Sequence, residues 1–492
     1  MKSDGRADAK NFVIDYLSEN NAALAALSDA IFSYGELGMQ ETESAATLVG
    51  NLRLHGFDVD TGISGMPTAF LATYGSGQPV IAIHSEYDAN PGNSQRAGVA
   101  HREEIVPGAP GHCEGHNVNA AVMTAAAIAC KYAMQRHHLS GTLKVFGAPG
   151  EEQLISRPFF VRDGFFDDVD VALHSHIHWE FQTEFGLVQT SVVSAEFVFH
   201  GESAHAAMAP WNGRDALDAV VLMDSGMAQF REHMQPGTTA HRVITDGGAQ
   251  PNVIPARAAI WWYFRSAEAE GARRLYEQAC KVAEGAALMS NCRLEVVMRA
   301  AVWPVRCNQL LAETIQRNIE RIGMPKWTDA EHTFARAVQE AAGKKAIGLP
   351  REVRPLQHMT RPIAASNDCG DISWKVPMAR VNFPANLPNI MFHEWAAGAA
   401  LATSIAHRGG LAGAMALAGT VVDLLCEPGL VDSVKRSFAM EIGEVRYRPL
   451  IDSDLRPPVD LNRALMDKYR EAMKPYYRPP QVGFAVPKGV PP

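Results

Sequence analysis

The chain has 492 residues, of which 47% are hydrophobic and 20% charged, and its net charge is -9. A chain of this length is too long for a single hydrophobic core, so we expect two to three domains. The acidic balance, without any basic block, argues against a nucleic-acid-binding surface.

The chain carries no pattern typical of secretion or of membrane insertion. Its first 21 residues lack an apolar signal core, and the most apolar late stretch, 411–426, is short and contains Asp423. Seven cysteines are scattered without disulfide or CxxC spacing, so we expect buried thiols. The sequence therefore predicts a soluble cytoplasmic protein with no membrane partner.

Residues 1–189 alternate helix and strand and are expected to form the first part of an α/β domain. Apolar periodicity predicts helices over 22–34, 41–55 and 119–134, and buried strands within 79–88, 141–152 and 169–176. The strands run into polar loops, which is where open α/β sheets place their functional sites.

Residues 190–302 change to strand-like alternation and predict a βαββαβ unit, the size of a small inserted domain. Its expected elements are a strand at 194–201, a helix at 214–233, strands at 241–248 and 256–265, a helix at 267–289 and a strand at 292–301. The larger domain then resumes over 303–492. It includes a polar insertion at about 325–362 of undefined shape, a helix at 411–425 and a proline-rich tail.

Three clusters of metal-binding side chains follow these strands or open a helix. GHCEGHN places Glu114 and His116 two residues apart in a loop, where both can reach one centre, while His112 is expected to be a hydrogen-bonded loop residue. In GAPGEE, one of Glu151 and Glu152 can bind a metal and the other can act as general base. Imidazole and carboxylate together suit Zn²⁺ or Mn²⁺.

The strand sequence HSHIH supplies His174, His176 and His178 on one face, and the end of the strand favours His176 as the ligand. Isolated polar residues occur in the inserted domain and near the C-terminus. His205 lies in a turn of small residues, Asn252 and Arg257 flank a proline-bounded turn able to grip a carboxylate, and Asp368, Asp371 and His393 occupy late loops.

These motifs, in this order, resemble the metal-dependent aminoacylase and carboxypeptidase family of amidohydrolases over residues 20 to 430, and within it the aminobenzoyl-glutamate hydrolase branch of the B type. The resemblance implies a zinc-peptidase-like α/β domain, with a mixed sheet flanked by helices, and an inserted ferredoxin-like lid and dimerisation domain. It also implies a homodimer that hydrolyses an amide of a small carboxylate-bearing substrate with one or two divalent ions, Mn²⁺ or Zn²⁺.

Carried over by position, the resemblance implies a role for each site residue. Glu151 matches the general base, and Asp88 matches an aspartate that orients a ligand histidine. Asp368 is expected to support the ligands in the same indirect way. His205 matches a lid histidine that reaches the partner subunit's active site, and Asn252, with Arg257, matches the substrate-holding turn. The expected metal ligands are Glu114, His116, Glu152, His176 and His393.

One departure concerns the metal. The related motif has cysteine where this chain has Glu114, and cysteine stands one place earlier, at Cys113. A carboxylate there can bridge two ions and favours Mn²⁺ or a similar oxygen-preferring ion. Two other functions stay open: hydrolytic deamination of an aminoaromatic acid, and a non-catalytic partner subunit. The aromatic residues Trp211 and Trp374 are expected either to contact an aryl group or to pack in the core.

Overall fold

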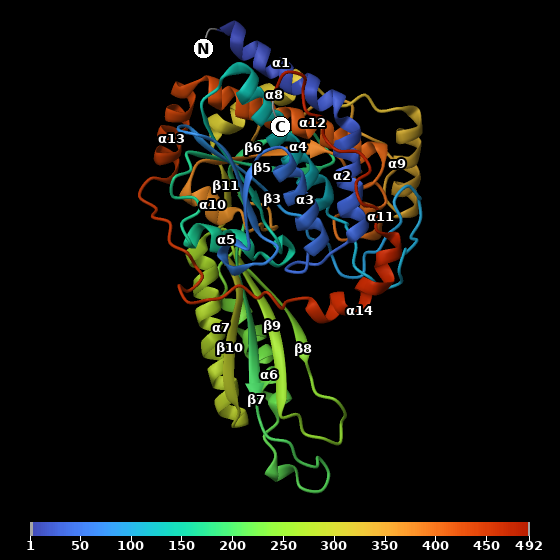
Figure 1. The fold of residues 1–492 in the computed structure, drawn as a ribbon. Coiled ribbons are helices and arrows are strands. Elements are labelled where there is room, and N and C mark those ends of the chain that lie inside the picture. The colour runs from blue at the N-terminus through green and yellow to red at the C-terminus, as the bar shows by residue number, and fades with distance from the viewer. Residues whose placement is uncertain (1–2, 491–492) are drawn as a thin grey trace.

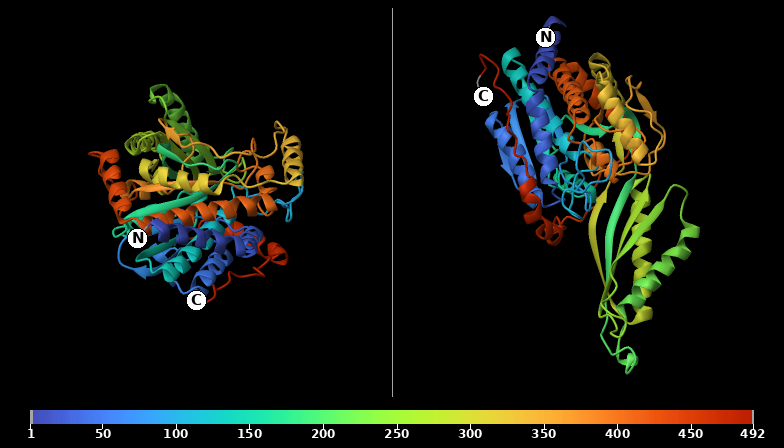
Figure 2. Two further views of the ribbon diagram at one scale, coloured as in Figure 1. Left: turned by 90° about the horizontal axis from the view of Figure 1, so that it is seen from above. Right: turned by 90° about the vertical axis from the view of Figure 1, so that its right-hand side faces the viewer.

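A computed structural model describes residues 3–490 of the chain. A large domain contains both ends of the described chain, and a narrower inserted domain projects from it (Figures 1 and 2). The inserted domain is formed by residues 191–302, so the large domain is built from the two flanking parts of the chain.

The large domain is organised around a mixed six-stranded sheet with the order β1-β2-β4-β3-β5-β13. The strands β3, β4, β5 and β13 are parallel neighbours, whereas β1 and β2 pair antiparallel at one edge. The central strands β3 and β5 are almost wholly buried, and each begins with an apolar run and carries at least one buried histidine toward its carboxyl end. The six strands are β1 (Asp58–Thr61), β2 (Phe70–Ser76), β3 (Val80–Ser85), β4 (Gly141–Gly147), β5 (Val171–His178) and β13 (Met378–Pro384).

Helices surround this sheet, and two long ones, α4 and α12, pack against each other and against its strands. Both are rich in alanine, and α12 also contains several glycines, so small side chains let the two helices approach closely. The helices of the large domain are α1 (Ser3–Glu19), α2 (Asn21–Tyr34), α3 (Thr42–Leu54), α4 (His116–His137), α5 (Ser156–Arg162), α8 (Gln309–Ile322), α9 (Asp329–Ala341), α10 (Gly370–Lys375), α11 (Trp395–Gly398), α12 (Ser404–Cys426), α13 (Pro428–Ile442) and α14 (Arg463–Met473).

By length and composition α12 could cross a membrane, but 94% of its most apolar window is buried inside the large domain. It contacts α1, α2, α4 and α8 and strand β13. Its apolar character therefore follows from its place in the core.

The inserted domain has the βαββαβ order that the sequence predicts. Its four strands form an antiparallel sheet in the order β10-β7-β9-β8, and its two helices pack against each other and against the sheet. This is the ferredoxin-like arrangement. The elements are β7 (Ser191–His200), α6 (Ala216–Phe230), β8 (Thr239–Asp246), β9 (Arg257–Ser266), α7 (Ala269–Ser290) and β10 (Arg293–Val302).

A small third sheet lies at the root of the inserted domain, with the order β11-β6-β12. It is composed of β6 (Glu184–Gln189), β11 (Val305–Cys307) and β12 (Gln357–Met359), which come from before, directly after and well after the insertion. Short 3₁₀ turns complete the chain: η1 (Ile63–Gly65), η2 (Glu151–Gln153), η3 (Pro210–Asn212), η4 (Arg231–His233) and η5 (Lys474–Tyr476).

Two segments whose shape the sequence does not define have definite structure. The polar insertion contains α9, which begins with a capping box between Thr328 and Glu331 and ends at Ala341, and it also supplies β12. The proline-rich tail lies against the large domain, where Phe484 is buried and packs on the ring of His55.

Candidate metal centre

Each group of polar residues expected at the centre lies at the end of a strand or the start of a helix. Asp88 follows β3, the Glu151–Glu152 pair forms η2 after β4, and His176 lies near the end of β5. His116 is the first residue of α4, and His393 lies in the loop before α11. Because β3, β4 and β5 are parallel neighbours, their carboxyl ends bring these side chains to one edge of the sheet.

Glycine shapes the loop that carries Glu114 and His116. Gly115 has φ 91°, a conformation that L side chains rarely adopt, and it directly precedes α4. A Cβ atom at this position would lie 2.4 Å from Cδ1 of Ile177. The loop therefore approaches β5 closely, which brings Glu114 within 4.0 Å of His176.

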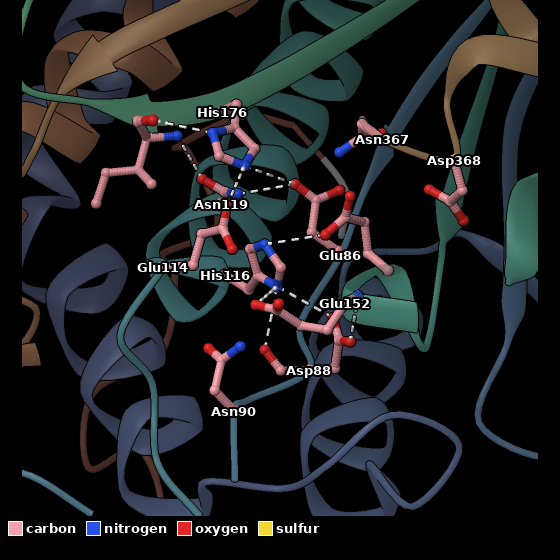
Figure 3. Close-up of polar contacts among 12 residues, drawn as sticks. Glu86, Asp88, Asn90, Glu114, His116, Asn119, Glu152, His176, Asn367 and Asp368 are labelled. Carbon is pink, nitrogen blue, oxygen red and sulfur yellow. Dashed lines mark hydrogen bonds and ion pairs between the residues drawn. The ribbon is translucent and has the colours of Figure 1, made fainter. Parts of the chain in front are cut away.

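The side chains form three overlapping groups whose potential ligand atoms lie within 4.8 Å of one another (Figure 3). One group is Glu114, Glu152 and His393, another is His116, Glu151 and Glu152, and the third is Glu86, His116 and His176. The structure thus brings together all five residues expected as ligands and Glu151, and it adds Glu86. Shared members make these groups one continuous centre.

His116 is held in the tautomer that a metal requires. Its Nδ1 lies 3.0 Å from Oδ1 of Asp88 and 3.1 Å from the Asp88 carbonyl oxygen, so Nδ1 carries the hydrogen and donates it. The other carboxylate oxygen of Asp88 accepts the Glu152 amide N–H at 2.9 Å. Asp88 therefore orients His116 and Glu152 together, with the lone pair of His116 Nε2 facing the centre.

The donor atoms fit a divalent cation. Within residues 3–490, Nε2 of His116 and Oε1 of Glu152 are buried polar atoms without a hydrogen-bond partner. Such atoms are costly unless something binds them. Imidazole nitrogens and carboxylate oxygens converging in this way suit Zn²⁺ or Mn²⁺.

Electrostatics at the Glu114 end also favour a cation. His393 Nε2 lies 2.6 Å from Glu114 and 3.2 Å from Glu152, and these hydrogen bonds raise the pKa of His393 to about 10. Burial acts to raise the pKa of Glu114, but the His393 hydrogen bond and nearby histidine charges outweigh it and lower the value to about 2. A protonated His393 therefore supplies positive charge between two carboxylates, and binding a metal there would release that proton.

Glu151 lies 3.5 Å from His116 Nε2 and is almost fully buried. Burial, and then the charges of Glu114 and Glu86, raise the pKa of Glu151 well above its ordinary value, although His116 acts against this. A carboxyl group with a raised pKa can both accept and return a proton near neutral pH.

The remaining motif residues lie outside this cluster. His112 is buried and its Nε2 donates to the Ile31 carbonyl oxygen, as a loop histidine. Cys113 donates to Asn90, so Glu114 is the member of this pair that reaches the centre. Asp368 contacts Ser156 and Arg157 rather than a ligand, and Asp371 accepts from Tyr447.

The lid residues His205, Asn252 and Arg257 are exposed, in loops or strand ends remote from the large domain (Figure 1). The Nδ1 atom of His205 accepts two backbone N–H groups, and Arg257 pairs with Asp246. Trp211 is 78% exposed. Trp374 packs against Trp303 and donates to a backbone carbonyl, so it serves packing.

Four residues lie behind the centre: Glu86, Asn119, Arg157 and His174. Sequence reasoning gave no role to Asn119 or Arg157, and it noted Glu86 and His174 only as neighbours of the expected site residues in the chain. Glu86 is fully buried and bound by the other three. A signal was present, since Glu86 and Asp88 stand two apart directly after a buried strand. Arg157 lies in the short helix α5, and no motif around it points to the centre.

Known proteins are similar to this chain over most of its length. The B-type chain of the p-aminobenzoyl-glutamate hydrolase of Escherichia coli K12 is 33% identical over 472 residues, covering 91% of this chain and 98% of that protein. Residues 188–286 match the M20 peptidase dimerisation domain. The chain belongs to the M20 family of metallopeptidases. This confirms the family that its motifs predicted.

The chain is also similar to more distant proteins and solved structures. The Xaa-Arg dipeptidase of Mus musculus is 26% identical, covering 88% of this chain and 93% of that protein. A dinuclear metal-binding M20 peptidase from Bacillus subtilis has TM-score 0.53 at 17% identity, covering 83% of this chain and 99% of that one. An aminobenzoyl-glutamate utilization protein from Klebsiella pneumoniae has TM-score 0.57 at 17% identity, covering 80% and 97%.

These relationships and the donor cluster identify this M20 protein as a metal-dependent hydrolase that acts on C–N bonds. Its fold is the expected α/β domain with an inserted dimerisation domain. Its cofactor is a divalent metal.

Proposed function

We propose that the protein hydrolyses the amide bond of a small N-acyl or N-aroyl amino acid, of the aminobenzoyl-glutamate type, or of a dipeptide. The observation that carries this is the position of Glu151, a buried carboxyl group 3.5 Å from a candidate metal ligand and within one cluster of donors. The 33% identity to a p-aminobenzoyl-glutamate hydrolase chain supports the choice of substrate.

In this proposal Glu114, His116, Glu152, His176 and His393 hold one or two divalent ions. When bound, these ions polarise the substrate carbonyl and make water a stronger nucleophile near neutral pH. Glu151 accepts a proton from the attacking water and passes it to the nitrogen of the leaving amine. Asp88 acts through His116, by keeping the hydrogen on Nδ1 and the lone pair on Nε2.

We propose Mn²⁺ as the physiological ion and Zn²⁺ as the alternative. The centre contains the carboxylates of Glu114 and Glu152, with Glu151 beside them, and the buried thiol of Cys113 points to Asn90. Oxygen-rich sites without thiolate favour harder cations. Titration of the metal-free protein with each ion, followed by hydrolysis assays, would decide between them.

Substrate recognition is proposed to involve the lid turn, with Asn252 and Arg257 holding a substrate carboxylate. Both are exposed at the end of the inserted domain, where a partner subunit can be reached. An arginine can grip a carboxylate with two parallel hydrogen bonds. Small substrates follow from this arrangement, since a closing lid excludes long peptides.

The direct experiment is hydrolysis of p-aminobenzoyl-glutamate by the Mn²⁺- or Zn²⁺-loaded protein, with release of p-aminobenzoate measured by chromatography. Dipeptides ending in arginine and other N-acyl amino acids are the comparison substrates. Turnover of one amide class, dependent on metal and lost in Glu151→Gln, would support the proposal. A metal-loaded protein inactive on all of them would contradict it.

Carboxylate recognition has its own test. We expect the methyl ester of a turned-over substrate to have a kcat/KM at least about tenfold lower, because a lost charged hydrogen bond is worth about 1.5–3 kcal/mol. The Arg257→Met variant should reduce that difference. Equal kcat/KM values for acid and ester would remove the basis for assigning Asn252 and Arg257.

A second candidate is hydrolytic removal of an amino group from an aromatic acid, which stays open because Glu114 stands where the usual motif has cysteine. Ammonia release from aminobenzoic acids would reveal this activity. A non-catalytic subunit is the third candidate, and the buried base Glu151 beside free donor atoms argues against it, since binding alone needs no such base.

We propose a cytoplasmic homodimer formed through the inserted domain. The match of residues 188–286 to a dimerisation domain supports assembly through this region. Native mass spectrometry of the purified chain would report a dimer, and a monomer that turns over substrate would contradict it.

A further inference from the structure

Glu86 occupies a fully buried position directly behind the two histidines of the centre (Figure 3). Its Oε1 accepts from Asn119 Nδ2 at 2.8 Å, and its Oε2 accepts from the guanidinium of Arg157. His174 Nε2 lies between the two oxygens, 3.2 and 3.1 Å away. These donors fix the orientation of the carboxylate from one side.

The opposite side of Glu86 faces the centre. Its Oε1 lies 3.8 Å from Nε2 of His176, the nitrogen expected to bind metal. Candidate ligand atoms of Glu86, His116 and His176 lie within 4.8 Å of one another. Oε1 accepts from Asn119 and shares the hydrogen of His174 Nε2 with Oε2, and its remaining neighbour is the Nε2 atom of His176.

The charges divide unevenly between the two halves of the centre. In the group of Glu114, Glu152 and His393 two carboxylates supply negative charge, whereas in the group of Glu86, His116 and His176 the carboxylate of Glu86 is the only anionic side chain. Histidine binds a metal as a neutral imidazole, so within that group Glu86 is the counter-charge for a divalent ion.

Arg157 is shared between Glu86 and a second buried carboxylate, that of Asp368. Its guanidinium also pairs with Asp368, which in addition accepts the Arg157 backbone N–H at 3.0 Å and the Ser156 hydroxyl at 3.1 Å. One guanidinium is thus shared between two carboxylates, so the three side chains together carry one negative charge when both carboxylates are ionised.

We propose that Glu86 is a sixth metal ligand, which binds the ion at His116 and His176 through Oε1. Asn119, His174 and the Arg157–Asp368 pair are positioning residues that hold its carboxylate toward the centre. The inference rests on the metal-binding part of the proposed function and is independent of the substrate.

The test is Zn²⁺ binding by the dialysed, metal-free full-length protein, measured by competition with a chromogenic chelator. Glu86→Gln removes the charge, and Glu86→Asp keeps the charge but withdraws the oxygen by about 1.5 Å, one carbon–carbon bond. We expect both variants to lose at least tenfold in affinity for one of two Zn²⁺ equivalents, with the other unchanged. The matched control is Asp423→Asn, since Asp423 is likewise a buried carboxylate bound by a cation, Lys10, and by an asparagine, Asn318.

The two Glu86 variants show whether Glu86 binds the ion directly or only supplies negative charge near it. Ligation by Glu86 would be overturned if Glu86→Asp bound both Zn²⁺ equivalents as tightly as the wild type and only Glu86→Gln lost affinity. It would also be overturned if both variants bound both equivalents with wild-type affinity. Should either variant fail to fold, anomalous diffraction from wild-type crystals soaked in Zn²⁺ decides. An Oε1–Zn²⁺ distance of about 2.0–2.2 Å supports the proposal, and one beyond about 3.5 Å overturns it. Failure of the amide assay would leave this measurement unaffected.

Discussion

At the scale of single residues, the proposed mechanism assigns the general base to Glu151. Glu151→Gln keeps the shape of the side chain but cannot take up a proton. We expect it to retain the bound metal and to lose at least about 10²-fold in turnover, the usual range for general-base catalysis. Metal content by elemental analysis and steady-state kinetics check this. Near-normal turnover at full metal content would remove Glu151 from the mechanism.

Our proposal that Glu114 is a metal ligand predicts that this residue influences which ion the centre prefers. Glu114→Cys restores the thiol that related motifs carry and replaces a hard oxygen with a soft sulfur. The affinity ratio of Zn²⁺ to Mn²⁺ should rise by an order of magnitude or more, measured by competition with one chelator. Cys113→Ser is the control, because Cys113 points to Asn90 and should leave the ratio unchanged. An unaltered ratio in Glu114→Cys would mean that residue 114 does not bind the metal.

The positions that sequence could predict at this scale are those with short motifs. Glu114, His116, Glu151 and Glu152 are adjacent or nearly adjacent in the chain, so pattern alone suggested a centre. His393 is a lone histidine, and only resemblance pointed to it. The contact between Glu86, which directly follows β3, and Arg157 in α5 could not be predicted, because the two residues meet only through packing of the folded sheet.

At the scale of elements, the start of α4 depends on Gly115. Gly115→Ala introduces a Cβ 2.4 Å from Ile177 and requires a strained φ of 91°. We expect the free energy of unfolding to fall by about 1–3 kcal/mol. Metal affinity should also fall, since Glu114 and His116 flank the altered residue.

Gly50→Ala provides the matched control for this loop. Gly50 lies within α3, and a Cβ there meets nothing within 4 Å. The substitution should stabilise the protein by about 0.4–1 kcal/mol and leave metal affinity unchanged. Urea unfolding and chelator competition measure both effects. Equal metal affinity in the two variants would show that the Gly115 turn does not shape the centre.

The contact between α3, α4 and the C-terminal tail predicts a pH effect on stability. His55 hydrogen-bonds Tyr132 at 2.7 Å and packs on Phe484, and burial, with the charge of Lys131, lowers the pKa of His55 to about 4. Between about pH 6.5 and 4 the unfolded chain binds the proton and the folded protein does not. Stability from this group is therefore complete above pH 6.5 and is lost as pH falls.

For His55 this amounts to about 2 kcal/mol between pH 7.5 and 5.0. His55→Gln can keep a hydrogen bond to Tyr132 but does not titrate. Its unfolding free energy should therefore depend less steeply on pH than that of the wild type, as urea titrations at the two pH values would measure. Parallel pH profiles would show that His55 is not the titrating group.

The helices and strands were predictable to different degrees. Strongly periodic segments, such as the βαββαβ unit, followed the expected order because alternation and helical spacing persist over whole elements. The helix α9 was missed although Thr328 and Glu331 form its capping box, because its surroundings are polar and the apolar face is narrow. The strands β6, β11 and β12 are short, and their sheet exists only because three distant segments meet beside the insertion.

At the scale of the whole molecule, the candidate lid residues of the inserted domain lie away from the candidate metal centre of the same subunit. His205 lies in the loop between β7 and α6, at the end of the domain remote from the large domain (Figure 1). If it takes part in the reaction in this conformation, it serves another subunit. The assembly is therefore part of the proposed active site rather than an addition to it.

Complementation between two inactive variants tests this arrangement. Glu151→Gln subunits lack the base and keep His205, whereas His205→Ala subunits lack the lid histidine and keep Glu151. In a mixed dimer one centre combines an intact Glu151 with His205 of the other subunit, and its partner centre lacks both. Equal mixing makes half of the dimers mixed, each with one working centre, so we expect about one quarter of wild-type activity after exchange of subunits.

Native mass spectrometry confirms that mixed dimers form, and mixing wild type with Glu151→Gln measures the exchange itself. Mixed dimers without activity would place His205 in its own subunit's chemistry, because an intact base and the lid histidine of the other subunit would then have been present together without effect.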